Sequence, residues 1–502
     1  MLEAHMPVCF QHSLERELKP HLVVIMADQL RFDVLGKGYT PAIDSLRSES
    51  VIFEHAYCSS PLCVPSRGSF YTGMVPNRSG SKINPWEQRD AARGDVKKGI
   101  DSLYTLMEEE WESIHSGKQH LYTEGGKLED RIDSKTRFYS TEQTYKTFLA
   151  ETGVSAPGGA RFRTRVPELV SGEFTKVSMY SNAESGRYEG GEFFYFDHYF
   201  MRKALEGLAE RTGDKPLLLN TTFVAPHPPF EIPEPYYSKV DKNEVQLPEN
   251  VRTYYPYQSP LQMYNLTGVI GTRYDREHWR ETWRVYLGLV SLLDAMVARI
   301  LDELKEQGLY DDALIIFTSD HGEMLGSHAL FQKMCMYEES VRIPLSFKFP
   351  SHENITPRTV LDEVSNIDVL PTLCDYLGLA ARQSFDGRSL LSAIRGGTPD
   401  SRAVFIQYDG NGSYSNFQRC VVKDRYKLIV DCFGAENYYE LYNVGSDPQE
   451  MNNLIFTAAE DDRVEELFSL LNEHMKRTGD ELSLQPLNLE QFRANYASIP
   501  AK

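Results

Sequence analysis

Cysteine, basic charge and long apolar runs are all scarce in this sequence, and each scarcity excludes a class of protein. Only 7 cysteines occur among 502 residues, none in a C-x-x-C pair, so neither a disulfide framework nor a zinc cage is expected. No apolar run reaches the length of about 18 residues that a membrane-spanning helix needs. With 53 Lys and Arg against 72 Asp and Glu, the formal net charge is −19. Binding to nucleic acid or to an anionic membrane surface is therefore not expected, because both depend on basic surfaces.

Residues 1–19 are interpreted as an N-terminal extension. They lack the apolar core of a signal peptide, and the opening MLEAHM is typical of residues left by an expression vector. Together with the few, mostly reduced cysteines, this favours a cytoplasmic location. A hydrophobic content of 41% is enough to bury a substantial core in one large domain with an appendage.

Three apolar segments of the chain run directly into ionisable residues. The segments and the residues that follow them are Leu22–Ala27 with Asp28, Leu217–Phe223 with His227, and Ala313–Ser319 with Asp320 and His321. Continuous apolar runs are typical of strands that are buried on both faces of a parallel sheet. A lone acid after a strand is usually a cap or a turn residue. Three such strand ends together predict a site at the carboxyl edge of the sheet.

The pattern of strands and helices changes near Leu379. Before it, the apolar strands alternate with helical segments, and residues 276–308 have the spacing of a long amphipathic helix. After it, short strands over 403–444 precede a helix over about 464–475. We predict an α/β domain over residues 20–379, with a large mixed, mostly parallel sheet flanked by helices. A smaller α+β subdomain with an antiparallel sheet is predicted over 380–502.

Cys63, in the segment SSPLCVPSRGSF, is the most informative single residue. An isolated cysteine is usually a buried structural thiol. A thiol phosphatase loop has five residues between its cysteine and its arginine, whereas three separate Cys63 from Arg67. Pro65 suits the first turn of a helix and Gly73 its end, which places Cys63 at a helix N-terminus. The partial positive charge there favours an anion or an oxyanion.

The segment CVPSRGSFYTG resembles the signature of the formylglycine-dependent type I sulfatases, a family of the alkaline phosphatase-like superfamily. Other segments are similar to the remaining family motifs, in the family's order: VVIMADQLRFD, SGKQH, APHPPF, TSDHGEMLGSHALFQK, and YKLI followed by YYELYNVGSDPQEMNNL. The resemblance implies an alkaline phosphatase-like sandwich. It also implies that a formylglycine-generating or anaerobic sulfatase-maturing enzyme oxidises Cys63 to formylglycine, whose hydrated aldehyde is the nucleophile. Ser66 would belong to the maturation signature.

The same resemblance implies a site for one divalent cation. Asp28, Asp320 and His321 correspond to the family's ligands, and an oxygen of the modified Cys63 would complete the set. Gln29 stands where many sulfatases carry a second aspartate, and its carbonyl oxygen can still bind a metal. Carboxylate oxygens favour a hard ion, so Ca²⁺ is expected first. The imidazole makes Mn²⁺ and Zn²⁺ the alternatives.

The remaining matched positions carry roles in the chemistry. Arg67 would stabilise the formylglycine hydroxyl, and Lys118 and Lys333 would neutralise the sulfate oxygens. His120 would take a proton from the diol and so release sulfate. His227 would bind the ester or protonate its leaving oxygen.

We therefore expect a sulfatase that acts on a sulfated carbohydrate or a glycosaminoglycan fragment. A phosphonate monoester or phosphodiester hydrolase is the main alternative, because Gln29 and His321 depart from the commoner sulfatase pattern. A choline- or arylsulfatase also stays open. A binding-only homologue is disfavoured, since every catalytic position is filled. The aromatic residues of the insertion over 184–203 either contact sugars or belong to a core helix.

Overall fold

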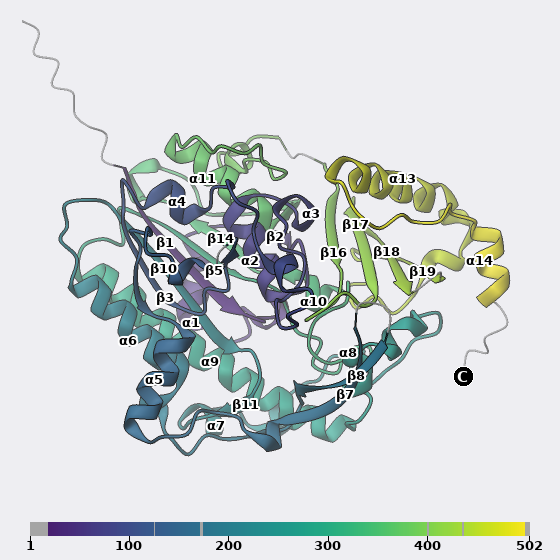
Figure 1. The fold of residues 1–502 in the computed structure, drawn as a ribbon, viewed down its shortest axis with the longest axis horizontal. Helices are drawn as coiled ribbons and strands as arrows, with labels where there is room; N and C mark the ends of the chain where they lie inside the picture. The colour runs from purple at the N-terminus through teal and green to yellow at the C-terminus, as the bar shows by residue number, and fades with distance from the viewer. Residues whose placement is uncertain (1–18, 125, 171–173, 399–400, 434–435, 497–502) are drawn as a thin grey trace, which may run out of the picture.

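A computed structural model describes residues 19–124, 126–170, 174–398, 401–433 and 436–496 (Figure 1). Apart from Lys19, the predicted N-terminal extension lies outside the described residues. The centre of the molecule is a nine-stranded sheet. Its strands run in the order β13 (Arg342–Ile343), β2 (Val51–Tyr57), β14 (Leu345–Lys348), β12 (Ala313–Ser319), β1 (His21–Asp28), β10 (Leu217–Pro226), β3 (Glu112–Gly117) and β6 (Arg137–Ser140), with β15 (Arg358–Ser365) paired to β2.

The middle of this sheet is parallel, as the continuous apolar runs predict. β1 is parallel to β10 on one side and to β12 on the other, and β3 and β6 continue in the same direction. Antiparallel pairs join β14 to β12 and to β2, and β13 to β2. β12 has the predicted bounds, whereas β10 continues past Phe223 to Pro226 and so leads directly into His227. The prediction of a mixed, mostly parallel sheet is confirmed.

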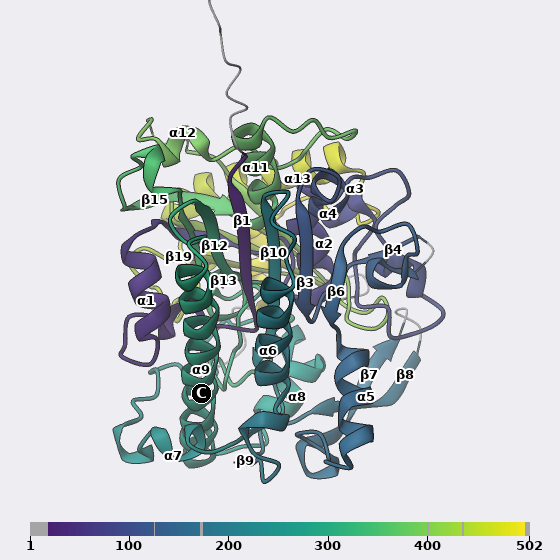
Figure 2. The same ribbon diagram turned by 90° about the vertical axis from the view of Figure 1, so that its left-hand side faces the viewer.

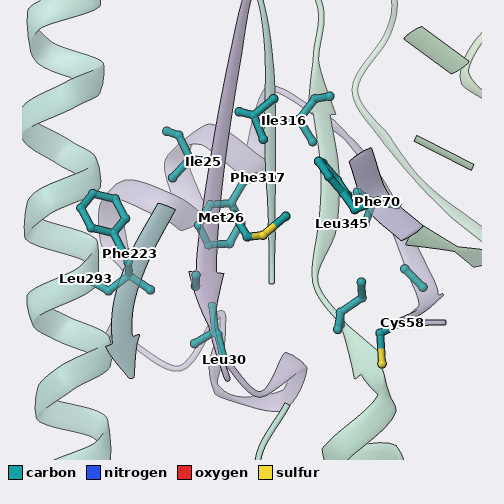
Figure 3. Close-up of a cluster of buried hydrophobic side chains, with 14 of the residues drawn as sticks. Ile25, Met26, Leu30, Cys58, Phe70, Phe223, Leu293, Ile316, Phe317 and Leu345 are labelled. Atoms are coloured by element: carbon teal, nitrogen blue, oxygen red, sulfur yellow. The ribbon is translucent and has the colours of Figure 1, made fainter. Parts of the chain in front are cut away.

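Helices cover both faces of the sheet. On one face lie α9 (Arg276–Glu306) and α6 (Phe196–Ala209), side by side in Figure 2, with α1 (Pro41–Ser48) packed against α9. Behind the sheet in that view lie α2 (Cys63–Thr72), α4 (Leu103–Met107) and α11 (Val369–Leu377). Side chains from both layers meet the sheet: Figure 3 shows Leu293 of α9 and Phe70 of α2 beside Ile25, Met26 and Phe317. This double covering explains why β1 and β12 are apolar along most of their length.

The C-terminal part forms a smaller sheet and a helix beside the large sheet (Figure 1). β16 (Val404–Tyr408), β17 (Phe417–Lys423), β18 (Tyr426–Phe433) and β19 (Glu436–Asn443) make an antiparallel sheet in that order, packed against α13 (Asp461–Thr478). Buried polar contacts fasten it to the α/β part: Lys427 Nζ lies 2.7 Å from Glu338, and Glu450 accepts from the Glu338 N–H at 2.7 Å. The antiparallel subdomain is confirmed, and the boundary at residue 380 stays a prediction.

The insertions between β3 and β10 include a long hairpin and two helices. β7 (Arg163–Val170) pairs with β8 (Phe174–Ser181), and α5 (Glu142–Thr152) packs near α6. Phe148 of α5 stacks on Tyr199 of α6 at 4.9 Å between ring centroids, and Tyr145 and Phe200 join this cluster. Most aromatic residues of α6 therefore serve packing, the second of the two expectations for this insertion.

The remaining elements are short. They are α3 (Pro76–Ser79), α7 (Tyr236–Lys239), α8 (Leu266–Gly271), α10 (Glu338–Val341), α12 (Leu391–Ile394), α14 (Leu489–Tyr496), β4 (Tyr122–Thr123), β5 (Gly126–Lys127), β9 (Ser185–Arg187) and β11 (Phe230–Ile232). Within the described ranges, no helix combines the length and the apolar character that crossing a membrane requires.

Candidate active site

Two neighbouring strands and one helix bring the predicted metal ligands together. β1 and β12 are parallel neighbours, so Asp28 at the end of β1 meets Asp320 and His321 just after β12. Cys63 begins α2, and its Sγ lies 3.2 Å from His321 Nε2 and 4.0 Å from Asp28 Oδ1. One ligand atom from each of these four buried residues lies within 4.8 Å of the others.

Two cations compensate the buried carboxylates. Arg67 donates from Nε to Asp320 Oδ2 at 2.8 Å and from Nη2 to Asp28 Oδ2 at 3.0 Å. Lys118 Nζ lies 2.6 Å from the same Asp28 oxygen. Burial raises the pKa of Asp28, but Lys118 and the other cations outweigh it and hold this pKa well below its usual range. Asp28 is therefore ionised although it is fully buried.

The free electron pairs of this cluster fit a divalent cation. Asp28 turns Oδ1 towards Cys63 while its Oδ2 meets Arg67 and Lys118. His321 Nδ1 lies 3.0 Å from the carbonyl oxygen of Gly322, so the neutral form of His321 carries its proton on Nδ1 and turns the Nε2 electron pair towards Cys63. Metal-bound histidines are typically fixed in this way by a hydrogen bond from the other ring nitrogen. Two carboxylates, an imidazole and the Cys63 position thus form a donor set whose chemistry suits a divalent cation.

The Cys63 position is electropositive. Burial and Asp28 disfavour a negative charge there. Lys333, Lys118 and His321 outweigh them and lower the pKa of the Cys63 thiol to about 5. Any anionic atom in this place is stabilised by the same groups.

Gln29 links the cluster to Lys333. Lys333 Nζ donates to Gln29 Oε1 at 2.7 Å, and Gln29 Nε2 donates to Glu323. Glu323 Oε1 in turn accepts from the backbone N–H groups of Leu325 and Gln332, at 3.0 and 2.6 Å. The Gln29 carbonyl oxygen keeps a second lone pair, so its predicted part in metal binding stays a prediction. Glu323, to which the sequence assigns no chemical role, holds the loop that carries Lys333.

His227 is a neutral imidazole in this arrangement. Its Nδ1 lies 2.5 Å from the Pro228 carbonyl oxygen, and Nε2 lies 3.3 Å from Lys333 Nζ. Burial, Lys118 and Lys333 hold the pKa of His227 well below its usual range. Asp197 of α6 fixes the strand end before it by accepting from the N–H groups of Val224 and Ala225, at 2.6 and 3.1 Å.

His120 has a carboxylate partner that the sequence does not reveal. Its Nε2 lies 2.9 Å from Oε2 of Glu142, at the first turn of α5. Burial lowers the pKa of His120, but Glu142 outweighs burial and raises this pKa above its usual value of 6.5. The two residues are 22 positions apart and belong to no common motif.

Left-handed backbone conformations gather at this site. Gln29, His120, Gln332 and Met334 have φ angles of 69°, 52°, 66° and 75°. Gly117, just before Lys118, has φ 112°, and a Cβ there would lie 1.9 Å from the Thr222 carbonyl oxygen. Such strained residues persist where the surroundings hold them, and they cluster at functional sites.

Two asparagines that sequence reasoning misses hold the start of α2. Asn84 Oδ1 accepts from the Val64 N–H at 3.2 Å, and Asn366 Nδ2 donates to Ser66 Oγ at 2.9 Å. His328, which lies between two matched positions in the sequence, is not among these contacts. It stacks on Tyr337 at 4.0 Å between ring centroids.

The sheet order and the cluster at its carboxyl edge define an alkaline phosphatase-like fold. In agreement, the structure resembles the phosphonate monoester hydrolase of Agrobacterium radiobacter with a TM-score of 0.73, at 20% identity over 92% of this chain and 96% of that one. The Sulfatase family model matches residues 20–379, and the model of the N-sulphoglucosamine sulphohydrolase C-terminal region matches 326–478. The chain belongs to the sulfatase family, and it is a sulfuric ester hydrolase.

Two further relatives show the range of this family. The choline-sulfatase of Rhizobium meliloti is 27% identical over 448 residues, covering 87% of this chain and 82% of the relative. The fold is also similar to that of a protein solved in complex with its substrate D-glucosamine-2-N,6-O-disulfate. The TM-score between the two structures is 0.68, at 19% identity over 92% of this chain and 99% of that one.

Proposed function

We propose that this sulfatase hydrolyses the sulfate ester of a sulfated carbohydrate or glycosaminoglycan fragment, with a nucleophile made from Cys63. The observation that carries the proposal is the position of Cys63: it begins α2 and faces Asp28, His321 and the cations of the cluster. The fold neighbour whose substrate is a sulfated glucosamine supports the sugar class.

The nucleophile is formylglycine, formed by a formylglycine-generating or anaerobic sulfatase-maturing enzyme. Its hydrated aldehyde supplies one hydroxyl to attack the sulfur and a second whose deprotonation releases sulfate. Arg67 lies across the carboxylates of Asp28 and Asp320 and keeps both in place beside it. The N-terminus of α2 adds partial positive charge where negative charge develops.

Asp28, Asp320, His321 and the modified residue 63 would hold one divalent cation, with Gln29 as a further oxygen donor. When bound, the cation supplies a Lewis acid that makes the nucleophilic hydroxyl more acidic. The carboxylates favour Ca²⁺, and the imidazole keeps Mn²⁺ and Zn²⁺ as alternatives.

Lys118 and Lys333 neutralise the sulfate oxygens from two sides. Lys118 reaches the cluster at Asp28, and Lys333 lies between Gln29 and His227. An electropositive, water-excluding pocket of this kind stabilises the charge that builds up during attack.

His227 and His120 move the protons. The negative charge of a bound sulfate favours the imidazolium form of His227, which is neutral in the free site, so substrate binding prepares it to protonate the leaving oxygen. His120, made more basic by Glu142, takes the proton of the second hydroxyl. His227, whose basicity the two lysines lower, thus serves as the acid, and His120, whose basicity Glu142 raises, serves as the base.

The phosphonate monoester hydrolase alternative rests on Gln29 and on the fold similarity to the Agrobacterium enzyme. The discriminating experiment compares kcat/KM for 4-nitrophenyl sulfate and for 4-nitrophenyl phenylphosphonate, with the matured enzyme loaded in turn with Ca²⁺, Mn²⁺ and Zn²⁺. We expect the sulfate to be the better substrate with at least one metal. A preference for the phosphonate with all three metals would favour the alternative. No turnover of either ester by confirmed formylglycine enzyme would favour a binding-only protein. The cytoplasmic location stays a prediction.

A further inference from the structure

Trp86 is half exposed beside the proposed base His120. The other tryptophans, Trp111, Trp279 and Trp283, are at most 4% exposed, whereas Trp86 is 50% exposed. Its ring centroid lies 5.7 Å from that of His120 and 6.4 Å from that of Tyr122. The indole plane crosses the His120 ring plane at 68° and the Tyr122 ring plane at 78°, so Trp86 contacts both rings edge to face.

The loop that carries Trp86 is fixed on both sides. Asn84 bonds to the first turn of α2 and also donates from Nδ2 to Asn411 Oδ1 at 2.8 Å. The backbone N–H of Glu87 donates to the Gly412 carbonyl at 3.2 Å. At Gly412 any added Cβ would lie 3.2 Å from Trp86 Cβ, so this turn packs closely under the indole. Exposure alone is common for an apolar side chain, but this indole is held open beside the proposed base, where a ligand that approaches residue 63 can contact it.

The charged groups around Trp86 indicate what that ligand carries. Lys176 is paired with Glu87, Lys127 with Glu129 at 3.3 Å, and Arg93 with Glu481 at 3.1 Å. Glu142, beside His120, adds a carboxylate whose side chain is 37% exposed. Lys82 shares Glu481 with Arg93, which also lies 3.7 Å from Asp90. Each of these described cations is therefore matched by a carboxylate, an arrangement that suits an uncharged ring better than a second sulfate or a carboxylate of the substrate.

We propose that the Trp86 indole stacks on the sugar ring of the leaving group, with Tyr122 at its side, and that the preferred substrate is a monosulfated, otherwise uncharged pyranose. The inference rests on the proposed function and narrows its substrate class. A pyranose presents a face of C–H groups, which suits the negative face of an indole, and a polar rim that stays in water. The sulfate then reaches residue 63 past His120, and Trp86 acts as a specificity-determining residue.

The test uses the matured, metal-loaded enzyme and the variants Trp86→Ala, Trp86→Phe and Phe193→Ala. Phe193 is also 50% exposed but packs against Arg202, and it serves as the matched control. The probes are a panel of monosulfated pyranoses, ethyl sulfate, which has no ring, and choline sulfate, which has a cation instead. For the best pyranose, Trp86→Ala should lower kcat/KM by roughly tenfold, or ~1.4 kcal/mol, mainly through KM. Ethyl sulfate should be unaffected, Trp86→Phe should restore most of the loss, and Phe193→Ala should change nothing.

Three results would overturn the inference. An equal loss with ethyl sulfate would make Trp86 a structural support of the site. A loss confined to choline sulfate would show a site for a cation. A wild-type preference for a disulfated or uronate-containing fragment would contradict the uncharged pyranose. Failure of the proposed function is distinct, because then wild-type enzyme would hydrolyse neither 4-nitrophenyl sulfate nor ethyl sulfate.

Discussion

Replacing Asp320 by asparagine should abolish the increase in melting temperature that a bound divalent cation gives the protein. Asp320 holds Arg67 Nε through Oδ2 and receives the backbone N–H groups of Gln29 and His321 on Oδ1, at 3.1 and 2.9 Å. Asparagine keeps the size of this side chain and removes its charge. The proposed cation site then loses one of its two carboxylates, which a hard ion tolerates poorly.

The structure gives an expected size both for the loss of stability without metal and for the stabilisation by metal. In the metal-free protein, Arg67 loses one of two buried carboxylates, and breaking such a pair costs ~3–5 kcal/mol, at the lower end here because Asp28 remains. A cation that binds only the folded state stabilises it by about 2.7 kcal/mol at 100 times its dissociation constant. At about 2 °C per kcal/mol for a large domain, wild-type protein should gain roughly 5 °C in Tm with metal, and Asp320→Asn should gain almost nothing.

The assay is differential scanning calorimetry of chelator-treated protein with and without Ca²⁺, Mn²⁺ or Zn²⁺. Asp386→Asn is the matched control, since it breaks the partly exposed pair with Arg78 at 2.7 Å. It should cost about 1 kcal/mol or less and keep the full metal response. A metal-dependent rise in Tm that survives in Asp320→Asn would refute the assignment of Asp320 as a ligand.

Three other perturbations test separate parts of the site and fold. If His227 protonates the leaving oxygen, His227→Ala should slow alkyl and sugar sulfates by roughly 10²–10⁴-fold and activated aryl sulfates much less; equal losses would make it a binding residue. His120 must be neutral to accept a proton, so activity is lost as the pH falls through its raised pKa; Glu142→Gln removes the group that raises this pKa, and the acidic limb of the kcat profile should move to lower pH. An unmoved limb would contradict the base role. Lys427→Met removes the buried cation that Glu338 and Glu450 share, and urea unfolding should show a loss of about 3–5 kcal/mol. Lys423→Met, at a partly exposed pair, should lose less than about 1 kcal/mol.

The elements with strong local signals could be predicted from the sequence. β1 and β12 follow from apolar runs that end in an acid, and α2 has the predicted start at Cys63 and end before Gly73. The meeting point of Asp28 and Asp320 could also be predicted, because neighbouring parallel strands have their carboxyl ends at the same edge of the sheet. The order of the strands carries no local signal, so the antiparallel pairs of β14 with β12 and with β2 could not be placed.

The contacts that tune the site could not be predicted, because each joins segments far apart in the chain. Glu142 reaches His120 from another element, and Asn84 connects α2 to Asn411, 327 positions away. Trp86 has only the ambiguous signal of a lone aromatic residue in a polar loop. Residue type alone does not distinguish such a side chain from a core residue. The two can be told apart only by their exposure in the folded chain.

The central claim is that Cys63 is a precursor and not a thiol nucleophile. A thiolate that attacked sulfur would form an adduct without an easy route of release, whereas a hydrated aldehyde has a second hydroxyl whose deprotonation expels sulfate. The most direct measurement is mass spectrometry of the peptide that contains residue 63, from protein made in a host with maturation capacity, alongside the specific activity of each preparation. Activity should rise in proportion to the fraction of formylglycine and vanish in Cys63→Ala. Activity that follows the unmodified cysteine, or that survives in Cys63→Ala, would contradict the account.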